Sequence, residues 1–252
     1  MKTLNVTSNK KVQIYNLSEP LGDARTAKIE VNVSDGNLVI DGLTDGEAVL
    51  ANGTLEHTEK QGPPWRSVDI SNRQASLTLK AGNSGQPWFR FPWSACNGAT
   101  EWQIHLNPKV QMDITAHSGG GNVQLDLAGM VVNNVLAETG GGNMKVVLPD
   151  NAANLNVVAK SGAGKVTVEI GDDITGSNSI DAGSGAGDIV VRVPNNIAAH
   201  IHATTGLGKT IIEPRFNKVD KDTYQSPEYD SAMDKIEILA HSGAGNVSVS
   251  LK

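Results

Sequence analysis

The chain has 252 residues, of which 27 are glycine, 38% are hydrophobic, 19% are charged and 4% are aromatic. Glycine without a three-residue period excludes collagen, the composition excludes a coiled coil, and the apolar share is enough for a packed core. A net charge of −6 without a basic stripe argues against nucleic acid as a partner. The single cysteine, Cys96, excludes an internal disulfide and a cysteine-based zinc site.

The start of the sequence gives no sign of a targeting segment. Met1 to Asn5 leads into no apolar stretch, and the longest purely apolar run is Ala48 to Ala51. We therefore expect no signal peptide, no anchor and no membrane span in this chain.

Residues 29–40 are the first predicted element. They alternate around Gly36 as a degenerate coil of the repeat described below would. Strand-like runs follow at 47–57, 66–71, 75–80 and 101–106. We therefore expect residues 1–108 to be an N-terminal β region with the first coil or coils and a cap, continuous with the rest of the chain.

The aromatic residues gather in this N-terminal region. All four tryptophans and two of the three phenylalanines lie between residues 65 and 102. Segment 87–93 has two open interpretations: a cap over the apolar end of a stacked fold, or a surface for a glycan or protein partner. Clustered aromatic residues with arginine suit binding hot spots. The candidate site residues are Trp65, Trp88, Phe89, Arg90, Phe91 and Trp93.

From about residue 109 the sequence repeats. Six segments carry Ser or Thr, then Gly-x-Gly, then an alternating apolar run: Ser118–Gly121, Thr139–Gly142, Ser161–Gly164, Ser184–Gly187, Thr205–Gly208 and Ser242–Gly245. The second glycines are 21, 22, 23, 21 and 37 residues apart, so the last spacing is one period plus an insertion at 214–231. A period of about 22 residues predicts a solenoid whose regular coils occupy residues 109–252.

The aligned units share their chemistry column by column. Apolar residues alternate with polar ones on both sides of the glycine corner, which is the period of a strand with one buried face. We predict that each unit is a strand, a corner, a second strand and a return loop, with the corner hydroxyls bonded to backbone groups. Two residues before each hydroxyl lies an alanine that we expect to face inward: Ala116, Ala137, Ala159, Ala182, Ala203 and Ala240.

The units SGGGNVQLDL, SGAGKVTVEI and SGAGNVSVSL resemble the bacterial toast-rack family, as does the closing segment DTYQSPEYDSAMDKIEILAHSGAG. That family is related to the LiaF-like and putative-adhesin β-solenoid domains of bacterial envelopes. The resemblance covers residues 30–42 and 100–252. It implies a single-stranded right-handed β-solenoid, a place at the cell envelope or outside the cell, and no catalytic residues.

Two glycine-rich segments suggest ligand binding but have simpler explanations. Gly206 to Thr210 ends like a phosphate-binding loop, yet it lacks the earlier glycine and its continuation is strand-like. Gly183 to Asp188 weakly resembles a calcium-binding repeat, yet lysine occupies the aspartate column in two units. We therefore expect no cofactor.

Titratable residues give no clear site either. His200 and His202 share one outward face, but no third metal ligand is evident, so we predict no metal site. Polysaccharide cleavage needs a cluster of carboxylates, whereas Glu169, Arg192 and Glu213 alternate in charge on successive units. No catalytic residue is predicted.

The outward columns also carry an ion pair and a few apolar residues. Glu138 and Lys160 share a column on adjacent units and are predicted to pair. Val147, Val190 and Ile211 are outward by alternation. They form either an exposed patch or the floor beneath a return loop.

The sequence therefore predicts an all-β, non-enzymatic structural or interaction module, with a protein or an envelope glycan as its partner. Glycan binding through segment 87–93 is the first alternative, and cleavage of a polysaccharide on an outer face is the second. The last strand, Val247 to Leu251, has no successor in the sequence with which to pair. An end-to-end homodimer through that strand is therefore a further hypothesis.

Overall fold

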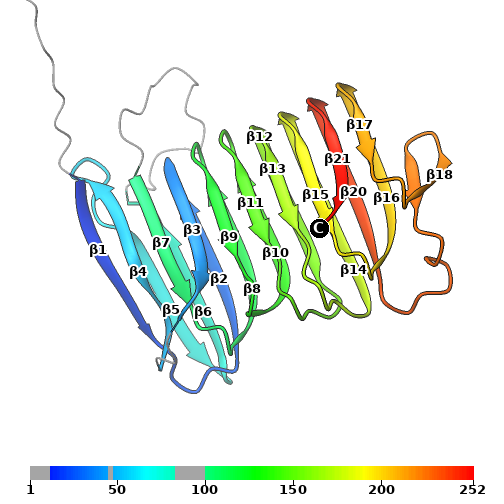
Figure 1. Cartoon of the computed structure of the whole chain (residues 1–252). Helices are drawn as coiled ribbons and strands as arrows, with labels where there is room; N and C mark the ends of the chain where they lie inside the picture. The colour runs from blue at the N-terminus through cyan, green and yellow to red at the C-terminus, as the bar shows by residue number, and fades with distance from the viewer. Residues whose placement is uncertain (1–11, 45–47, 83–99) are drawn as a thin grey trace, which may run out of the picture.

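The computed structural model describes residues 12–44, 48–82 and 100–252, and its 21 strands form two sheets. Sheet A has ten strands, in the order β1 (Val12–Pro20), β4 (Val49–Thr58), β7 (Thr100–Leu106), β3 (Gly36–Gly42), β9 (Val123–Asp126), β11 (Met144–Val147), β13 (Val166–Glu169), β15 (Ile189–Val193), β21 (Val247–Leu251) and β17 (Thr210–Ile212). Sheet B has eleven, in the order β5 (Trp65–Ser71), β6 (Gln74–Lys80), β2 (Thr26–Val33), β8 (Gln111–Ser118), β10 (Val131–Thr139), β12 (Asn156–Ala163), β14 (Ser177–Ala186), β20 (Lys235–Ala244), β16 (Ala198–Leu207), β19 (Thr223–Gln225) and β18 (Asn217–Asp220). Figure 1 shows the strands side by side in one stack, from β1 at one end to β17 and β18 at the other.

Each unit of the repeat contributes one strand to sheet B and the next strand to sheet A, and we call such a pair a coil. Strands of neighbouring coils pair in parallel, with Ala137 opposite Ala159 in sheet B and Val146 opposite Val168 in sheet A. These four side chains are fully buried between the sheets. The all-β prediction and the inward alanine column are thus confirmed, whereas the right-handed sense of the coil and the boundary near residue 108 stay predictions.

The last coil in the sequence is not the last coil in the stack. β20 lies between β14 and β16, and β21 lies between β15 and β17. The segment between β17 and β20 gives the chain the length to return to this position. The prediction that Val247–Leu251 is an unpaired terminal strand is therefore wrong, and so is the argument for a homodimer through it. Sequence spacing does not reveal this order, because every unit offers the same pairing columns.

The N-terminal end has the same arrangement. β2 and β3, which contain the predicted coil at 29–40, lie next to β8 and β9, while β6 and β7 form the coil outside them. The predicted strands at 47–57, 66–71, 75–80 and 101–106 correspond to β4, β5, β6 and β7. β1 escaped prediction, because its buried residues are confined to its second half.

Antiparallel strands close both sheets at the N-terminal end. β4 and β1 extend sheet A beyond β7, and β5 extends sheet B beyond β6. An ion pair between Glu19 on β1 and Arg66 on β5 links the two sheets, and the hydrogen bond and charge of Glu19 raise the pKa of Arg66. The Glu19 side chain is only 2% exposed, so its charge depends on Arg66 for compensation.

At the C-terminal end the insertion at 214–231 extends sheet B alone. β19 pairs antiparallel with β16, and β18 pairs with β19. Phe216 is buried against the core, and the Ser226 hydroxyl bonds with both the N–H and the carbonyl of Ala199. The insertion therefore closes this end of sheet B, whereas β17 remains the last strand of sheet A.

Candidate functional site

The Ser/Thr column forms a continuous ladder of hydroxyls. Each hydroxyl donates a hydrogen bond of 2.7–2.9 Å to a glycine carbonyl of the neighbouring coil: Ser118 to Gly36, Thr139 to Gly121, Ser161 to Gly142, Ser184 to Gly164, Ser242 to Gly187 and Thr205 to Gly245. The predicted structural role of the column is confirmed. Because each hydroxyl proton is engaged by a carbonyl, the ladder does not supply a nucleophile activated by a base.

A second ladder lies one residue after the corner. A side-chain oxygen accepts a hydrogen bond of 2.7–3.0 Å from the backbone N–H of the next coil: Asn37 from Asn122, Asn122 from Asn143, Asn143 from Lys165, Asp188 from Asn246 and Asn246 from Lys209. Lys165 interrupts the ladder, because an ammonium group cannot accept a hydrogen bond. This ladder escaped prediction, although the run of Asn and Asp in one column was its signal. It also explains the segment Gly206 to Thr210 as a corner rather than a phosphate loop.

The corner glycines allow the coils to approach closely. A Cβ atom on Gly140 would lie 2.3 Å from the carbonyl oxygen of Gly119 in the next coil. Gly142 has a φ of +153°, and its Cβ would lie 2.4 Å from the Gly121 oxygen. The middle residue, Gly141, has nothing within 4 Å of such an atom. The two outer glycines are therefore structural requirements, and the middle position is not.

Ion pairs on the outer faces connect neighbouring coils. Lys160, predicted to pair with Glu138, instead pairs with Asp181 at 2.7 Å, and Glu138 pairs with His117 at 3.2 Å. The strands of Glu138 and Lys160 are adjacent, but the lysine side chain turns to the adjacent strand on its other side, β14, where Asp181 lies.

The predicted alternation of Glu169, Arg192 and Glu213 holds only in part. Arg192 pairs with Glu169 at 3.3 Å, and Lys145 pairs with the same carboxylate at 3.4 Å. Glu213 is displaced from Arg192 because β21 lies between their strands and places Ser250 opposite Arg192. The face is therefore an ion-paired surface, and these residues form no cluster of carboxylates.

The two histidines of β16 pack against the insertion. The ring centroid of His200 lies 5.5 Å from that of Tyr229, and His202 Nδ1 lies 3.3 Å from the Thr223 hydroxyl. Burial raises the pKa of Tyr229, and the nearby Glu237 carboxylate adds to this shift. Among residues 12–44, 48–82 and 100–252, no group of three His, Cys, Asp or Glu side chains is placed to hold a metal ion.

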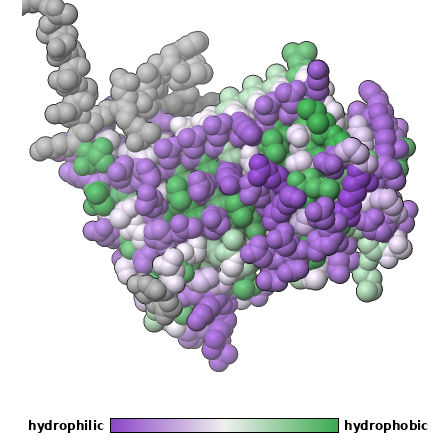
Figure 2. Space-filling model, in the orientation of Figure 1, coloured by the Kyte–Doolittle hydropathy of each residue, from purple (hydrophilic) through white to green (hydrophobic). Residues whose placement is uncertain are grey.

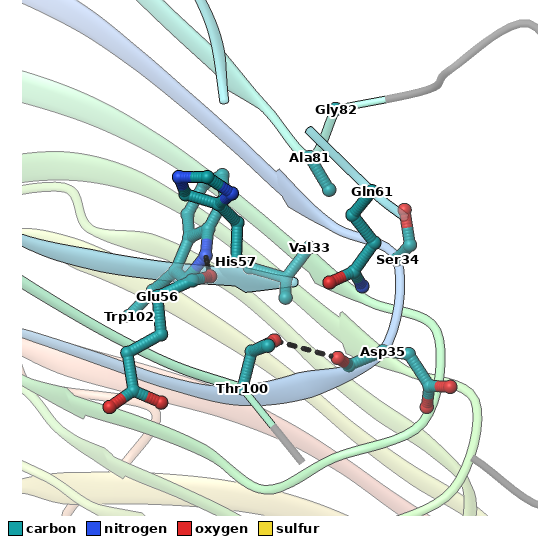
Figure 3. Close-up of a pocket in the computed structure, with 10 residues that line it drawn as sticks. All are labelled: Val33, Ser34, Asp35, Glu56, His57, Gln61, Ala81, Gly82, Thr100 and Trp102. Atoms are coloured by element: carbon teal, nitrogen blue, oxygen red, sulfur yellow. Dashed lines mark hydrogen bonds between the residues drawn. The ribbon is translucent and has the colours of Figure 1, made fainter. Parts of the chain in front are cut away.

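A small hollow lies at the N-terminal end of the stack, between the corners of the outer coils (Figure 3). Its cavity volume of about 10 Å³ is far below the range of about 300–1,000 Å³ that is usual for ligand pockets. Its polar groups serve the backbone: the Thr100 hydroxyl donates to the Asp35 carbonyl, and the Trp102 indole N–H donates to the Glu56 carbonyl, both at 3.0 Å. His57 in its wall is 8% exposed. The hollow therefore has the character of a packed corner.

The predicted aromatic site is described only at Trp65. Its side chain on β5 is 52% exposed, and the Lys80 ammonium group lies 5.8 Å from the ring centroid. The other candidates lie outside the described residues: Trp88, Phe89, Arg90, Phe91 and Trp93. Their segment joins β6 to β7, the two strands of the outer N-terminal coil.

Large exposed hydrophobic side chains gather at the two ends of the stack. Seven of the ten in the described residues belong to the terminal strands of either sheet or to the last coil: Val12, Ile14, Trp65, Val68, Leu207, Ile211 and Val219. Val147 and Val190, which were predicted to be outward, are half-buried. Figure 2 shows a mostly hydrophilic surface with separate hydrophobic patches.

Comparison with known proteins agrees with the fold. The model of the N-terminal domain of toast_rack, DUF2154, matches residues 3–169. The crystal structure of a putative cell adhesion protein from Clostridium sporogenes ATCC 15579 is similar, with a TM-score of 0.67 and 19% identity over 96% of this chain and 100% of that chain.

Further comparisons add little to this. A putative adhesin from Bacteroides fragilis NCTC 9343 has a TM-score of 0.33 and 14% identity over 95% of this chain and 97% of its own. A putative adhesin from Parabacteroides merdae ATCC 43184 has a TM-score of 0.30 and 12% identity over 97% of both chains. No curated protein matches the sequence. Within the described part of the chain, no helix has the length and apolar character needed to cross a membrane.

Proposed function

The chain belongs to the toast-rack family, and from that premise we propose that it is a non-enzymatic interaction module of the bacterial cell envelope. The proposal rests on how the repeat uses its polar side chains. The corner hydroxyls and the Asn and Asp side chains bond to the backbone of the next coil, so the regular coils act as a scaffold. The similar fold of a putative cell adhesion protein from Clostridium sporogenes supports the same conclusion.

The ends of the stack are the places where this scaffold would make contacts. Exposed apolar side chains are more common there than on the central coils, and such side chains favour association with a partner. Ile14 on β1 is 62% exposed and Ile211 on β17 is 56% exposed. Leu239, on β20 in the interior of sheet B, is 41% exposed and offers a comparison.

Co-sedimentation with purified cell-wall sacculi tests the proposal. We expect the chain to bind saturably, and we expect Ile14→Ser or Ile211→Ser to weaken binding while Leu239→Ser leaves it unchanged. Sacculi with and without teichoic acids separate binding to peptidoglycan from binding to its attached polymers. A chain that stays in the supernatant with every preparation would contradict a role at the cell wall.

Glycan binding through segment 87–93 and Trp65 is the second candidate. The exposure of Trp65 and the lysine above its ring favour it, because aromatic faces and nearby cations suit polar ligands. A titration of tryptophan fluorescence with peptidoglycan fragments and teichoic acids tests it. Trp102 is 1% exposed and serves as a constant background. A saturable shift that disappears in Trp88→Ala and Trp93→Ala supports the site, and a signal unchanged by every glycan contradicts it.

A further inference from the structure

β17 leaves one side of its backbone without a neighbouring strand. Its other side pairs in parallel with β21: the Val247 N–H donates to the Lys209 carbonyl, and the Glu213 N–H donates to the Val249 carbonyl. In a parallel ladder the backbone N–H and carbonyl groups of alternate residues point to the same neighbouring strand, so those of Ile211 also point to β21. The N–H and carbonyl groups of Thr210 and Ile212 therefore point away from the sheet, and in the described residues no strand lies on that side.

The other three ends of the two sheets are each closed by antiparallel strands. β4 and β1 close sheet A beyond β7, β5 closes sheet B beyond β6, and β19 and β18 close sheet B beyond β16. Only the end at β17 lacks such a strand in the described part of the chain. The architecture therefore indicates an antiparallel strand as the missing neighbour of β17.

The insertion strands β19 and β18 lie in sheet B, across the interior from that position. Because sheet B continues past β16 with β19 and β18, it reaches two strands further than sheet A (Figure 1). Tyr224 on β19 is opposite the buried Ile201, so both side chains point to the interior between the sheets. Tyr224 is half-buried, and the Lys218 ammonium group lies 5.8 Å from its ring centroid. A strand added to β17 would cover this ring.

The space that β19 and β18 occupy also restricts which kind of partner can pair with β17. A second folded copy that continued sheet A would bring its own sheet B into the space of β19 and β18. A single extended segment adds to β17 without that collision. The geometry therefore favours an extended peptide over a second copy of the fold.

The side chains of β17 define which extended peptide fits. Lys209, Ile211 and Glu213 alternate with the inward-facing Thr210 and Ile212, so they share the outer face. Neither Lys209 nor Glu213 forms an ion pair among the described residues. An antiparallel strand would suit them with an acidic residue opposite Lys209, an apolar residue opposite Ile211 and a basic residue opposite Glu213.

We propose that β17 is a docking edge at which an extended segment of a partner protein adds antiparallel to sheet A. This inference rests on the proposed interaction role and names the place and chemistry of one contact. Hydrogen bonds from Thr210 and Ile212 give the affinity, and the charges of Lys209 and Glu213 set the direction of the added strand. Apolar side chains on the inner face of that segment pack against Ile212 and Tyr224.

The probe is a synthetic peptide with the sequence Thr-Lys-Thr-Ile-Ile-Glu-Thr, whose charges complement β17 only when the peptide lies antiparallel. Its matched control, Thr-Glu-Thr-Ile-Ile-Lys-Thr, complements β17 only when it lies parallel. Backbone hydrogen exchange of the full chain at millimolar peptide is the measurement. We expect the amides of Thr210 and Ile212 to exchange slower by about tenfold or more with the first peptide. The amide of Ile211, already bonded to β21, should change little.

Three variants make the result specific. Thr210→Pro removes the outward N–H without breaking the ladder to β21 and should abolish binding, whereas Thr210→Val should bind as wild type. Lys209→Glu, which leaves the backbone unchanged, should weaken the first peptide by about two- to fivefold.

Any of three results would overturn the proposal. Exchange at Thr210 and Ile212 that neither peptide slows, or a preference for the control peptide, excludes the antiparallel edge. A dimer of the chain alone that Thr210→Pro dissociates would show that the occupant is a second copy. Binding to sacculi is measured separately, so failure of the peptide experiment leaves the interaction role itself in place.

Discussion

At the scale of single residues, each corner combines hydroxyl, glycine and amide groups in one hydrogen-bonded unit. The hydroxyl of Ser161 is held against the Gly142 carbonyl at 2.9 Å, which is possible only because the corner glycines bring neighbouring coils close together. The Asn143 side chain then bonds to the Lys165 N–H of the next coil at 3.0 Å. Side chains that could serve chemistry elsewhere are therefore engaged by the backbone here.

Removing one hydroxyl of the ladder should destabilise the fold. In Ser161→Ala the half-buried Gly142 carbonyl loses its donor, at a cost of about 0.5–1.5 kcal/mol. The exposed Ser67 provides a matched control, and Ser67→Ala should lie within about 0.5 kcal/mol of wild type. Urea unfolding curves compare the two variants. Equal midpoints would show that the ladder contributes nothing to stability.

The same substitution should destabilise the fold at one glycine of a corner and be tolerated at the adjacent glycine. Gly140→Ala places a methyl group 2.3 Å from the Gly119 carbonyl oxygen, so the coils must shift apart at a cost of about 1–3 kcal/mol. Gly141→Ala meets nothing within 4 Å and should be tolerated. Thermal unfolding of the two proteins checks this. A destabilised Gly141→Ala with an intact Gly140→Ala would reverse the account of the corner.

The hydroxyl column and the inward alanines could be predicted from the sequence because they recur in every unit. The second ladder, of Asn and Asp side chains, was missed because Lys165 and Lys209 interrupt a column that otherwise holds Asn and Asp. The Glu138–Lys160 pair was wrong for a different reason, since register places two residues side by side but does not decide which neighbour a long side chain reaches.

At the scale of strands and loops, the insertion at 214–231 has two effects. It returns the chain so that β20 and β21 can enter between the coil of β14 and β15 and the coil of β16 and β17. It also covers the exposed edge of β16 with β19. Phe216 anchors it in the core at 4% exposure. A break in the period predicted the insertion itself. Its structural role could not be predicted, because strand order depends on which edges meet in space.

Truncating the anchor should therefore destabilise the end of the stack. Phe216→Ala removes a buried ring at a cost of about 3–5 kcal/mol. The exposed Val219 in the same insertion is a control, and Val219→Ala should change stability little. Hydrogen exchange locates the effect, which should appear first in β16 and β19. A wild-type stability in Phe216→Ala would mean that the insertion is not anchored by this ring.

The alanine column should be sensitive to size in the middle of the stack. Ala159→Leu overpacks the space inside the corner at a cost of about 1–3 kcal/mol. The outermost N-terminal coils show the contrast, because Val31 and Leu79 occupy the same column there. Val158→Leu, on the outward face, is the control, and denaturant unfolding is the measurement. An unchanged midpoint in Ala159→Leu would contradict the tight packing of this column.

At the scale of the whole molecule, regular coils form the middle of the stack and antiparallel strands close most of its ends. The all-β class could be predicted from the repeat and its family resemblance. The position of the ends could not, since at each end of the stack two coils change places relative to chain order. The exchange at the C-terminal end makes β17, rather than the last strand of the sequence, the edge of sheet A.

The most direct test is a map of backbone hydrogen exchange for the full chain with and without soluble cell-wall fragments. If the coils are a scaffold and contacts form at the ends, protection should increase at β1, β5 or β17 and stay unchanged in β10 to β13. Protection confined to β10 to β13 would contradict this account, because it would place the binding surface on the central coils.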